Sequence, residues 1–339
     1  MNERVLLIDV DSHNFPNLVL MKLSAYHKAE GDKVNFIKLT PEDKKLILTG
    51  QPMWFDGEYD RIYAACVFTE NEKIALNLRN MGARVGGTGA IRVMNFGGGY
   101  GFQQFLLPEQ ENIYPDYELY GDEFKDTAYG FLTRGCPREC PFCIVSRKEG
   151  NRAYKVADLW EFYEDQNVIK LLDPNILACK DHMELLQQLV DSGAWVDFTQ
   201  GLDARLINFS NLKLIKKMKI KMLHFAWDNP RNRKMKDYFY FIREYLNLRP
   251  EKMKVYVLTN FWSTIDEDLE RVYWLRDNGF DPYVMIYDKE HAPKEVKRLQ
   301  RYVNCKWIFH TIDDFNDYVH HNWGTITQQT DNSRLGEIK

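Results

Sequence analysis

This sequence has no run of apolar residues long enough to span a membrane, and Met1 to Arg4 lead directly into an expected strand instead of a signal peptide. It also has no excess of positive charge, because 45 Lys and Arg are balanced by 49 Asp and Glu, and the formal net charge is -4. A chain without a basic field lacks the usual attraction for polynucleotides, which disfavours a nucleic-acid substrate without excluding one. We expect a cytoplasmic protein with no membrane partner.

Cysteine is scarce, yet half of it lies in one short stretch. Cys136, Cys140 and Cys143 are three of the six cysteines, and their spacing is CxxxCxxC. Pro137 and Pro141 each follow a cysteine and prevent a continuous helix, so the loop is expected to curl around a ligand. In a reducing compartment, clustered thiols indicate a metal. Three thiolates from one loop suit iron and sulfide, and they leave one iron of a cubane without a protein ligand.

A structural zinc site is the alternative for this loop. Tetrahedral zinc needs four ligands, and only the isolated Cys66, Cys179 and Cys305 remain to complete the set. We expect these three to be ordinary thiols, since a single cysteine is most often a small buried apolar residue. A non-catalytic Fe-S or zinc-binding electron-transfer protein therefore remains a rival interpretation.

The cysteine loop resembles the signature of the radical S-adenosylmethionine (radical SAM) superfamily, in which an aromatic residue, here Phe142, directly precedes the third cysteine. The resemblance implies that Cys136, Cys140 and Cys143 hold a [4Fe-4S] cluster and that SAM chelates the fourth iron. One electron then cleaves SAM to a 5′-deoxyadenosyl radical, which abstracts hydrogen from a substrate. It also implies a one-electron donor such as flavodoxin or ferredoxin. The substrate, whether a small molecule, a peptide or RNA, is not identified by the sequence.

The length and the order of the expected elements indicate two domains. A chain of 339 residues is about twice the usual domain size. In residues 1–118, strands alternate with helices, which predicts a small open parallel α/β sheet of the Rossmann-like type. Residues 107–120 lose all periodicity and are expected to form the linker. The expected strands are 5–8, 34–37, 61–66 and 83–85, and the expected helices are 17–30 and 72–80.

Residues 119–318 repeat a strand followed by a helix six times. The predicted fold is an incomplete parallel (βα)6 radical SAM barrel, because eight units would close a full barrel. Residues 319–339 are polar and are expected to be a flexible C-terminal tail. The expected strands are 129–132, 169–172, 195–198, 222–226, 255–258 and 283–286. The first helix after the cysteine loop is expected at 156–163, where Val156, Leu159, Trp160 and Tyr163 have helical spacing.

The first domain resembles the cobalamin-binding-type domain that precedes many radical SAM barrels. Asp11-Ser12-His13 begins like the DxHxxG loop in which the histidine ligates cobalt, but Pro16 occupies the position of the glycine. We therefore expect a cobalamin-domain-like module that acts as a structural cap, with cobalamin possible but not favoured. A cobalamin-dependent radical SAM methyltransferase is the alternative function. The glycines at 97–101 fit no dinucleotide fingerprint and are expected to form a turn or hinge.

Polar residues follow the carboxyl ends of the barrel strands, where a parallel barrel builds its active site. SAM requires acceptors for its ammonium, a cation for its carboxylate and partners for its ribose hydroxyls. Asp173 and Asn175 stand where the family receives the ammonium, although the common GGE form is absent. Arg205 can form a bidentate pair with the SAM carboxylate, or else with Asp203 or Asp228. The expected cofactor-binding residues are Phe142, Asp173, Asn175, Gln200, Asp203, Arg205 and Asp228, with Asp228 assigned to the ribose.

Overall fold

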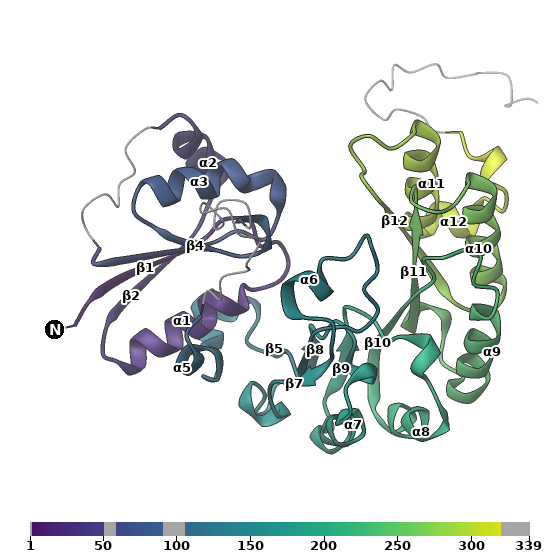
Figure 1. Ribbon diagram of the computed structural model, residues 1–339, viewed down its shortest axis with the longest axis horizontal. Coiled ribbons are helices and arrows are strands. Elements are labelled where there is room, and N and C mark those ends of the chain that lie inside the picture. Colours follow the sequence, from purple (N-terminus) through teal and green to yellow (C-terminus); the bar gives the residue numbers. More distant parts are fainter. Residues whose placement is uncertain (1, 51–58, 91–105, 320–339) are drawn as a thin grey trace, which may run out of the picture. The chain divides into compact units, whose positions relative to one another are not determined.

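The computed structural model describes residues 2–50, 59–90 and 106–319. It divides into two compact units, the first comprising Met1–Ala226 with Lys234–Lys254 and the second Trp227–Arg233 with Val255–Lys339. The chain is an α/β protein with a four-stranded and a six-stranded sheet (Figure 1), so the predicted α/β class with parallel sheets is confirmed. Among the described helices, none is both long enough and apolar enough to cross a membrane.

The four-stranded sheet forms the amino-terminal part of the first unit. Its strand order is β2-β1-β3-β4, and all three neighbouring pairs are parallel. Because successive side chains of a strand point to opposite faces, β1 contributes to two cores. The strands are β1 (Arg4–Asp9), β2 (Lys33–Lys38), β3 (Arg61–Ala65) and β4 (Arg84–Gly86), and the helices are α1 (Leu18–Ala29), α2 (Pro41–Leu48) and α3 (Glu72–Asn80).

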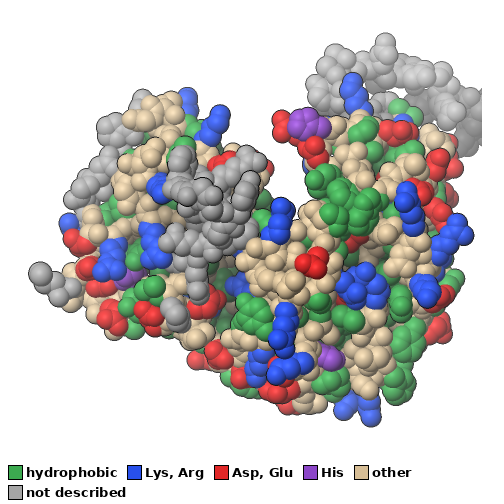
Figure 2. All heavy atoms as spheres, viewed as in Figure 1, with side chains coloured by type: hydrophobic (Ala, Val, Ile, Leu, Met, Phe, Trp, Pro, Cys, Tyr) green, Lys and Arg blue, Asp and Glu red, His purple; other side chains and the backbone are tan. Residues whose placement is uncertain are grey.

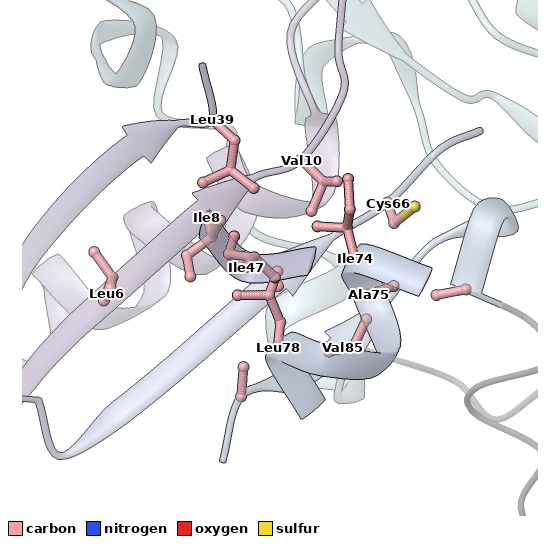
Figure 3. Packing of buried hydrophobic residues seen from close by; sticks show 13 residues of the cluster. Leu6, Ile8, Val10, Leu39, Ile47, Cys66, Ile74, Ala75, Leu78 and Val85 are labelled. Carbon is pink, nitrogen blue, oxygen red and sulfur yellow. The ribbon is translucent and has the colours of Figure 1, made fainter. Parts of the chain in front are cut away.

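Helices cover both faces of this sheet. Leu6 and Ile8 of β1 pack in one buried cluster with residues of α2 and α3, including Ile47 and Leu78 (Figure 3). The alternate residues of β1 pack in a second cluster with Leu20 and Leu23 of α1. A strand in a sheet that is buried on both faces has a continuous apolar sequence. This is why the Val5 to Ile8 segment was recognisable as a strand.

The helix α2 was not predicted, although its start is visible in the sequence. The Thr40 side chain accepts a hydrogen bond from the Asp43 N–H at 3.1 Å, and the Asp43 carboxylate accepts one from the Thr40 N–H at 2.9 Å. Pro41 occupies the first helical position, where its missing N–H has no intrahelical role. This reciprocal capping box was overlooked because the short helix carries few apolar residues.

The six-stranded sheet contains all six of the strands expected after the linker. Its order, β12-β11-β10-β9-β8-β5, follows the chain, and the pairs β5–β8, β8–β9 and β9–β10 are parallel. The strands are β5 (Thr127–Gly130), β8 (Val168–Leu171), β9 (Trp195–Phe198), β10 (Lys219–Ala226), β11 (Met253–Thr259) and β12 (Asp281–Ile286). The helices are α5 (Pro108–Glu111), α6 (Val145–Glu149), α7 (His182–Ser192), α8 (Phe209–Lys217), α9 (Met235–Leu246), α10 (Ile265–Asp277), α11 (Lys294–Asn304) and α12 (Lys306–Thr311).

The prediction of a helix at 156–163 is wrong. The segment directly follows β7 (Tyr154–Lys155), which pairs antiparallel with β6 (Thr133–Arg134), and it contains a single 3-10 turn at Leu159–Glu161. The Glu161 carboxylate accepts the N–H of Asp158 at 2.7 Å and closes that turn. Pairing with β6 fixes the extended backbone before a helix can start, so helical spacing alone was misleading.

The stretch 107–120, predicted to be the linker, makes hydrogen bonds to other parts of the first unit. The Tyr117 hydroxyl donates to the Phe162 carbonyl oxygen at 2.7 Å, and the Tyr120 hydroxyl donates to Asp9 Oδ2 at 2.7 Å. Burial raises the pKa of both tyrosines. These buried hydroxyls tie the stretch to the four-stranded sheet and to the segment after the cysteine loop. The predicted glycine turn at 97–101 and residues 320–339 of the predicted tail lie outside the described residues.

Candidate metal centre

The three clustered cysteines lie in a loop between β6 and α6. Each is partly exposed, and none of the six cysteines forms a disulfide in the described chain. The Cys143 N–H donates to the Cys140 carbonyl at 2.9 Å, which closes a tight turn between the second and third cysteines. The helix α6 starts only at Val145. The loop therefore curls as the two prolines predicted, and its thiols are accessible to a metal.

Glycine is required immediately before the first cysteine. Gly135 has a φ of +77°, and a Cβ atom there would lie 2.2 Å from the Arg152 carbonyl oxygen. The Cys136 N–H donates to the Gly150 carbonyl at 3.1 Å. The returning segment around residues 150–152 thus packs directly on the start of the loop and holds its first cysteine.

Asp173, which follows β8, holds the entrance to the cysteine loop. It is 4% exposed, and its Oδ1 accepts from the Leu132 N–H at 3.1 Å, the Thr133 N–H at 2.5 Å and the Thr133 hydroxyl at 2.6 Å. Burial raises the pKa of Asp173 to about 6, against the opposing effect of these hydrogen bonds. The carboxylate expected to receive SAM is therefore bonded to the chain that leads into the loop.

Asn175 is the predicted residue with an unused polar atom. It is 3% exposed, and its Nδ2 donates to Cys136 Sγ at 3.6 Å. Its carbonyl oxygen Oδ1 is buried and has no hydrogen-bond partner among the described residues. A buried acceptor without a donor is unfavourable, by about 1–3 kcal/mol. An ammonium or N–H group arriving beside Cys136 would satisfy it, so this side chain fits the SAM ammonium.

Asp203 joins two arginines in the loop after β9. Its carboxylate pairs in a bidentate fashion with Arg205, at 2.7 and 3.0 Å, and accepts from Arg138 Nε at 2.6 Å. Burial raises the pKa of Asp203, but the two arginines lower it more, so its pKa lies below the usual value. Arg205 therefore forms the ion pair that was its alternative assignment. Arg138, which lies between the first two cysteines, was not predicted and could have been noticed as the cation inside the loop.

The remaining predicted residues are Gln200, Phe142 and Asp228. Gln200 is exposed after β9, and Phe142 is half-buried between Pro141 and Cys143. Asp228 belongs to the second unit, where its backbone carbonyl accepts from Arg271 Nη1 at 3.0 Å.

Arg271 itself was missed by the sequence analysis. It is 1% exposed, pairs with the equally buried Asp268, and also donates to the Leu258 carbonyl at 2.9 Å. Burial lowers the pKa of Arg271 and raises that of Asp268. Since its partners follow β10 and end β11, this buried cation braces strand ends within the second unit.

A second unpredicted group lies in the strands themselves. Lys170 of β8 and Asp197 of β9 are partners in the parallel register, and Asp197 Oδ1 lies 3.6 Å from His224 Nδ1 of β10. Burial raises the pKa of Asp197 and lowers that of His224 to about 4. Polar residues at alternate positions of otherwise apolar strands are the signal that could have revealed them.

The loop that begins like a cobalamin-binding motif uses its carboxylate internally. Asp11 accepts from the Val67 N–H at 2.8 Å and the Phe68 N–H at 3.0 Å. His13 is exposed and stacks on Phe68, with ring centroids 6.4 Å apart. A Cβ on Gly87 would lie 2.2 Å from the Cys66 carbonyl, so that glycine serves close packing of the chain on itself. The His13 imidazole remains accessible, while the Asp11 carboxylate is bonded to the backbone of Val67 and Phe68.

The remaining cysteines differ in exposure. Cys66 and Cys179 are buried, and burial raises the pKa of both thiols, whereas Cys305 is exposed. The first two match the expected buried thiols. On the face of the molecule shown in Figure 2, charged side chains of both signs lie side by side, as the small net charge implied.

No family model and no curated protein matches this chain. Among solved structures, it is similar to the radical S-adenosylmethionine methyltransferase TsrM from Kitasatospora setae with cobalamin and a [4Fe-4S] cluster bound, at 14% identity and a TM-score of 0.40, over 84% of this chain and 69% of that one. The same enzyme with tryptophan substrate and the SAM analogue aza-SAM gives the same identity and TM-score, over 91% and 71%. These structures belong to the superfamily that the cysteine loop resembles.

Proposed function

We propose that the chain is a radical SAM enzyme. The observation that carries the proposal is a loop with three accessible thiols, spaced CxxxCxxC, beside the buried and unsatisfied carbonyl oxygen of Asn175. A zinc site would need a fourth ligand, and the two buried thiols Cys66 and Cys179 are not in this loop. Three thiolates with an open fourth position suit a [4Fe-4S] cluster that binds SAM.

Each residue near the loop has a proposed task. Cys136, Cys140 and Cys143 would hold the cluster, and Asn175 would accept the SAM ammonium while donating to the Cys136 sulfur. Such a cluster with SAM supplies, on one-electron reduction, a 5′-deoxyadenosyl radical able to abstract hydrogen from a substrate. Phe142, Gln200, Asp203 and Arg205 stay candidates for contacts to SAM, as does Asp228 for its ribose.

The architecture fits this proposal. The six-stranded sheet would be the incomplete (βα)6 barrel of residues 119–318, with residues 1–118 as the cobalamin-domain-like module and 319–339 as the tail. Asp173, Asn175 and Asp203 all follow strands at the carboxyl end, where a parallel barrel carries its chemistry. A substrate would enter at that end, and an acidic carrier such as flavodoxin or ferredoxin would supply the electron.

The first experiment measures the cluster. Protein reconstituted anaerobically should bind about four irons and four sulfides per chain, and Cys136→Ala, Cys140→Ala or Cys143→Ala should abolish this. Cys305→Ala, at an exposed cysteine outside the loop, is the matched control and should retain full iron. Stoichiometric zinc without iron in anaerobic protein would refute the cluster and favour the zinc-binding alternative.

The second experiment measures the reaction. With dithionite as reductant, the parent should convert SAM to 5′-deoxyadenosine, slowly in the absence of substrate. Asn175→Leu should weaken SAM binding, because it removes the carbonyl acceptor and keeps a similar volume. A reduced cluster that neither binds nor cleaves SAM would leave the electron-transfer protein as the better assignment.

A cobalamin-dependent methyltransferase is the second candidate. The observation in its favour is the exposed His13 in the loop after β1, whose imidazole could reach a cobalt. Protein offered hydroxocobalamin should nevertheless retain little of it, because Pro16 replaces the motif glycine and Asp11 is bonded to Val67 and Phe68. Retention near one equivalent that is lost in His13→Ala would establish this candidate instead.

A further inference from the structure

A hollow of about 640 Å³ lies beside the cysteine loop in the first unit. One wall comes from the loop and from the segment that returns to it, and the other comes from the chain after β8. Its lining residues include Pro137 of the loop, Arg152 and Lys155 of the returning segment, and Lys180 and Asp181 after β8. The residues discussed above for SAM are not among them.

The hollow is predominantly cationic. Arg152, Lys155 and Lys180 face a single acidic lining residue, Asp181. Lys155 is already paired with Asp158 at 2.6 Å and with Glu184 at 3.0 Å. Arg152 and Lys180 are exposed, and in the described chain no hydrogen bond or ion pair involves their side chains. These two cations are therefore available to an acidic partner.

Both walls of the hollow belong to segments that bond to the first cysteine through a neighbouring residue. Arg152 lies in the returning segment, whose Gly150 carbonyl accepts from the Cys136 N–H at 3.1 Å. Lys180 follows the turn that starts at Asn175, whose Nδ2 donates to Cys136 Sγ at 3.6 Å. An electron delivered at this surface would reach the cysteine sulfur through a few packed groups.

We propose that this hollow is the docking surface for an acidic one-electron carrier protein that reduces the cluster. The proposal rests on the proposed function, because it requires a cluster in the loop. One electron leaves the reduced carrier and enters the cluster, and no covalent bond forms or breaks. Since the net charge of the chain is -4, an acidic carrier is repelled by the molecule as a whole, and a local cationic surface is what would steer it to the cluster.

Reduction kinetics test the proposal. Reconstituted holoprotein is mixed anaerobically with reduced flavodoxin, and the oxidation of the flavin is followed by stopped flow. At low ionic strength, Arg152→Glu with Lys180→Glu should slow the second-order reduction about tenfold or more. Added salt should shrink this difference, because it screens the exposed charges. The neutral pair Arg152→Gln with Lys180→Gln should give an intermediate rate.

Two controls separate the possible failures. Lys213→Glu with Lys217→Glu reverses two exposed cations on α8 and should leave the rate unchanged. Dithionite should reduce the cluster of the Arg152/Lys180 variant as fast as that of the parent. Equal flavodoxin rates for parent and variant, or equal slowing by the α8 control, would overturn this docking surface while leaving the enzyme assignment intact. A parent whose cluster fails to form, or is not reduced by dithionite, would overturn the proposed function itself and the docking surface with it.

Discussion

The buried carboxyl of Asp173 predicts a distinctive dependence of stability on pH. Its pKa is about 6 in the folded chain and 3.8 for an ordinary aspartate. Between these values the folded chain keeps a proton that the unfolded chain releases, so the free energy of unfolding falls as pH rises. The two pKa values differ by about 2, and at 1.36 kcal/mol for each pKa unit the effect amounts to about 3 kcal/mol.

Asp173→Asn isolates this effect. Oδ1 of Asp173 accepts three hydrogen bonds from Leu132 and Thr133 at distances of 2.5 to 3.1 Å, and Oδ2 also accepts from the same Leu132 N–H, at 3.2 Å. An asparagine carbonyl in the same place can accept them without carrying a charge. Relative to the parent, the variant should therefore gain about 3 kcal/mol in the free energy of unfolding between pH 4 and pH 7.5. Asp173→Ala should lose stability at every pH, because it leaves buried N–H donors without an acceptor.

Urea denaturation of the apoprotein, followed by circular dichroism under reducing conditions, measures the difference. Asp191→Asn, at an exposed position of α7, is the matched control and should follow the parent profile. If the difference between the parent and Asp173→Asn does not change with pH, burial is not what governs this carboxyl. If the free energy of unfolding of the parent instead increases relative to that of Asp173→Asn as pH rises, the folded chain favours the ionised carboxylate. That result would refute the predicted direction of the pKa shift.

Two further predictions concern Asn175, which donates a hydrogen bond to the Cys136 sulfur, and Gly87. Asn175→Ala should lower the midpoint potential of the reconstituted cluster in a titration monitored by electron paramagnetic resonance, because a hydrogen bond to the Cys136 sulfur favours the reduced state; an unchanged potential would mean that the contact is absent once the cluster is bound. Gly87→Ala should lower the free energy of unfolding by about 1–3 kcal/mol more than Gly82→Ala. Both glycines have a φ near +100°, but only at Gly87 would a Cβ meet backbone, 2.2 Å from the Cys66 carbonyl, whereas nothing lies within 4 Å at Gly82. Equal losses in the two variants would show that the positive φ alone, and not the contact with the Cys66 carbonyl, determines the loss in the free energy of unfolding.

Most strands could be read from the sequence because each is a short apolar run. The segment 195–198 was located to the residue as β9, and β5 and β8 were displaced by one or two residues. The capping box at Thr264 and Glu267, which opens α10, is likewise visible in the sequence. These features are local, so neighbouring residues determine them.

The failures have a common cause in contacts between distant segments. The helix expected at 156–163 is replaced by pairing of Tyr154–Lys155 with Thr133–Arg134, which no local pattern reveals. The partners of Asp173 lie about 40 residues earlier in the chain. Arg271 contacts Asp228 and Leu258 through backbone carbonyls, and such contacts depend on how elements pack and not on which residues neighbour them.

Asp173, Asn175 and Asp203 follow the ends of β8 and β9 as expected, but their contacts indicate that they support the cysteine loop. Asp173 bonds to the chain entering the cysteine loop, Asn175 to its first cysteine, and Asp203 to Arg138 between the first two cysteines. A metal-binding loop needs such support, because a site displaced by a fraction of an ångström loses affinity and reactivity. Three side chains expected to hold the cofactor thus hold the loop that would bind it. Among these three side chains, Asn175 has a buried acceptor, Oδ1, without a hydrogen-bond partner in the described chain. The contacts of that oxygen are therefore the first to examine when SAM is added.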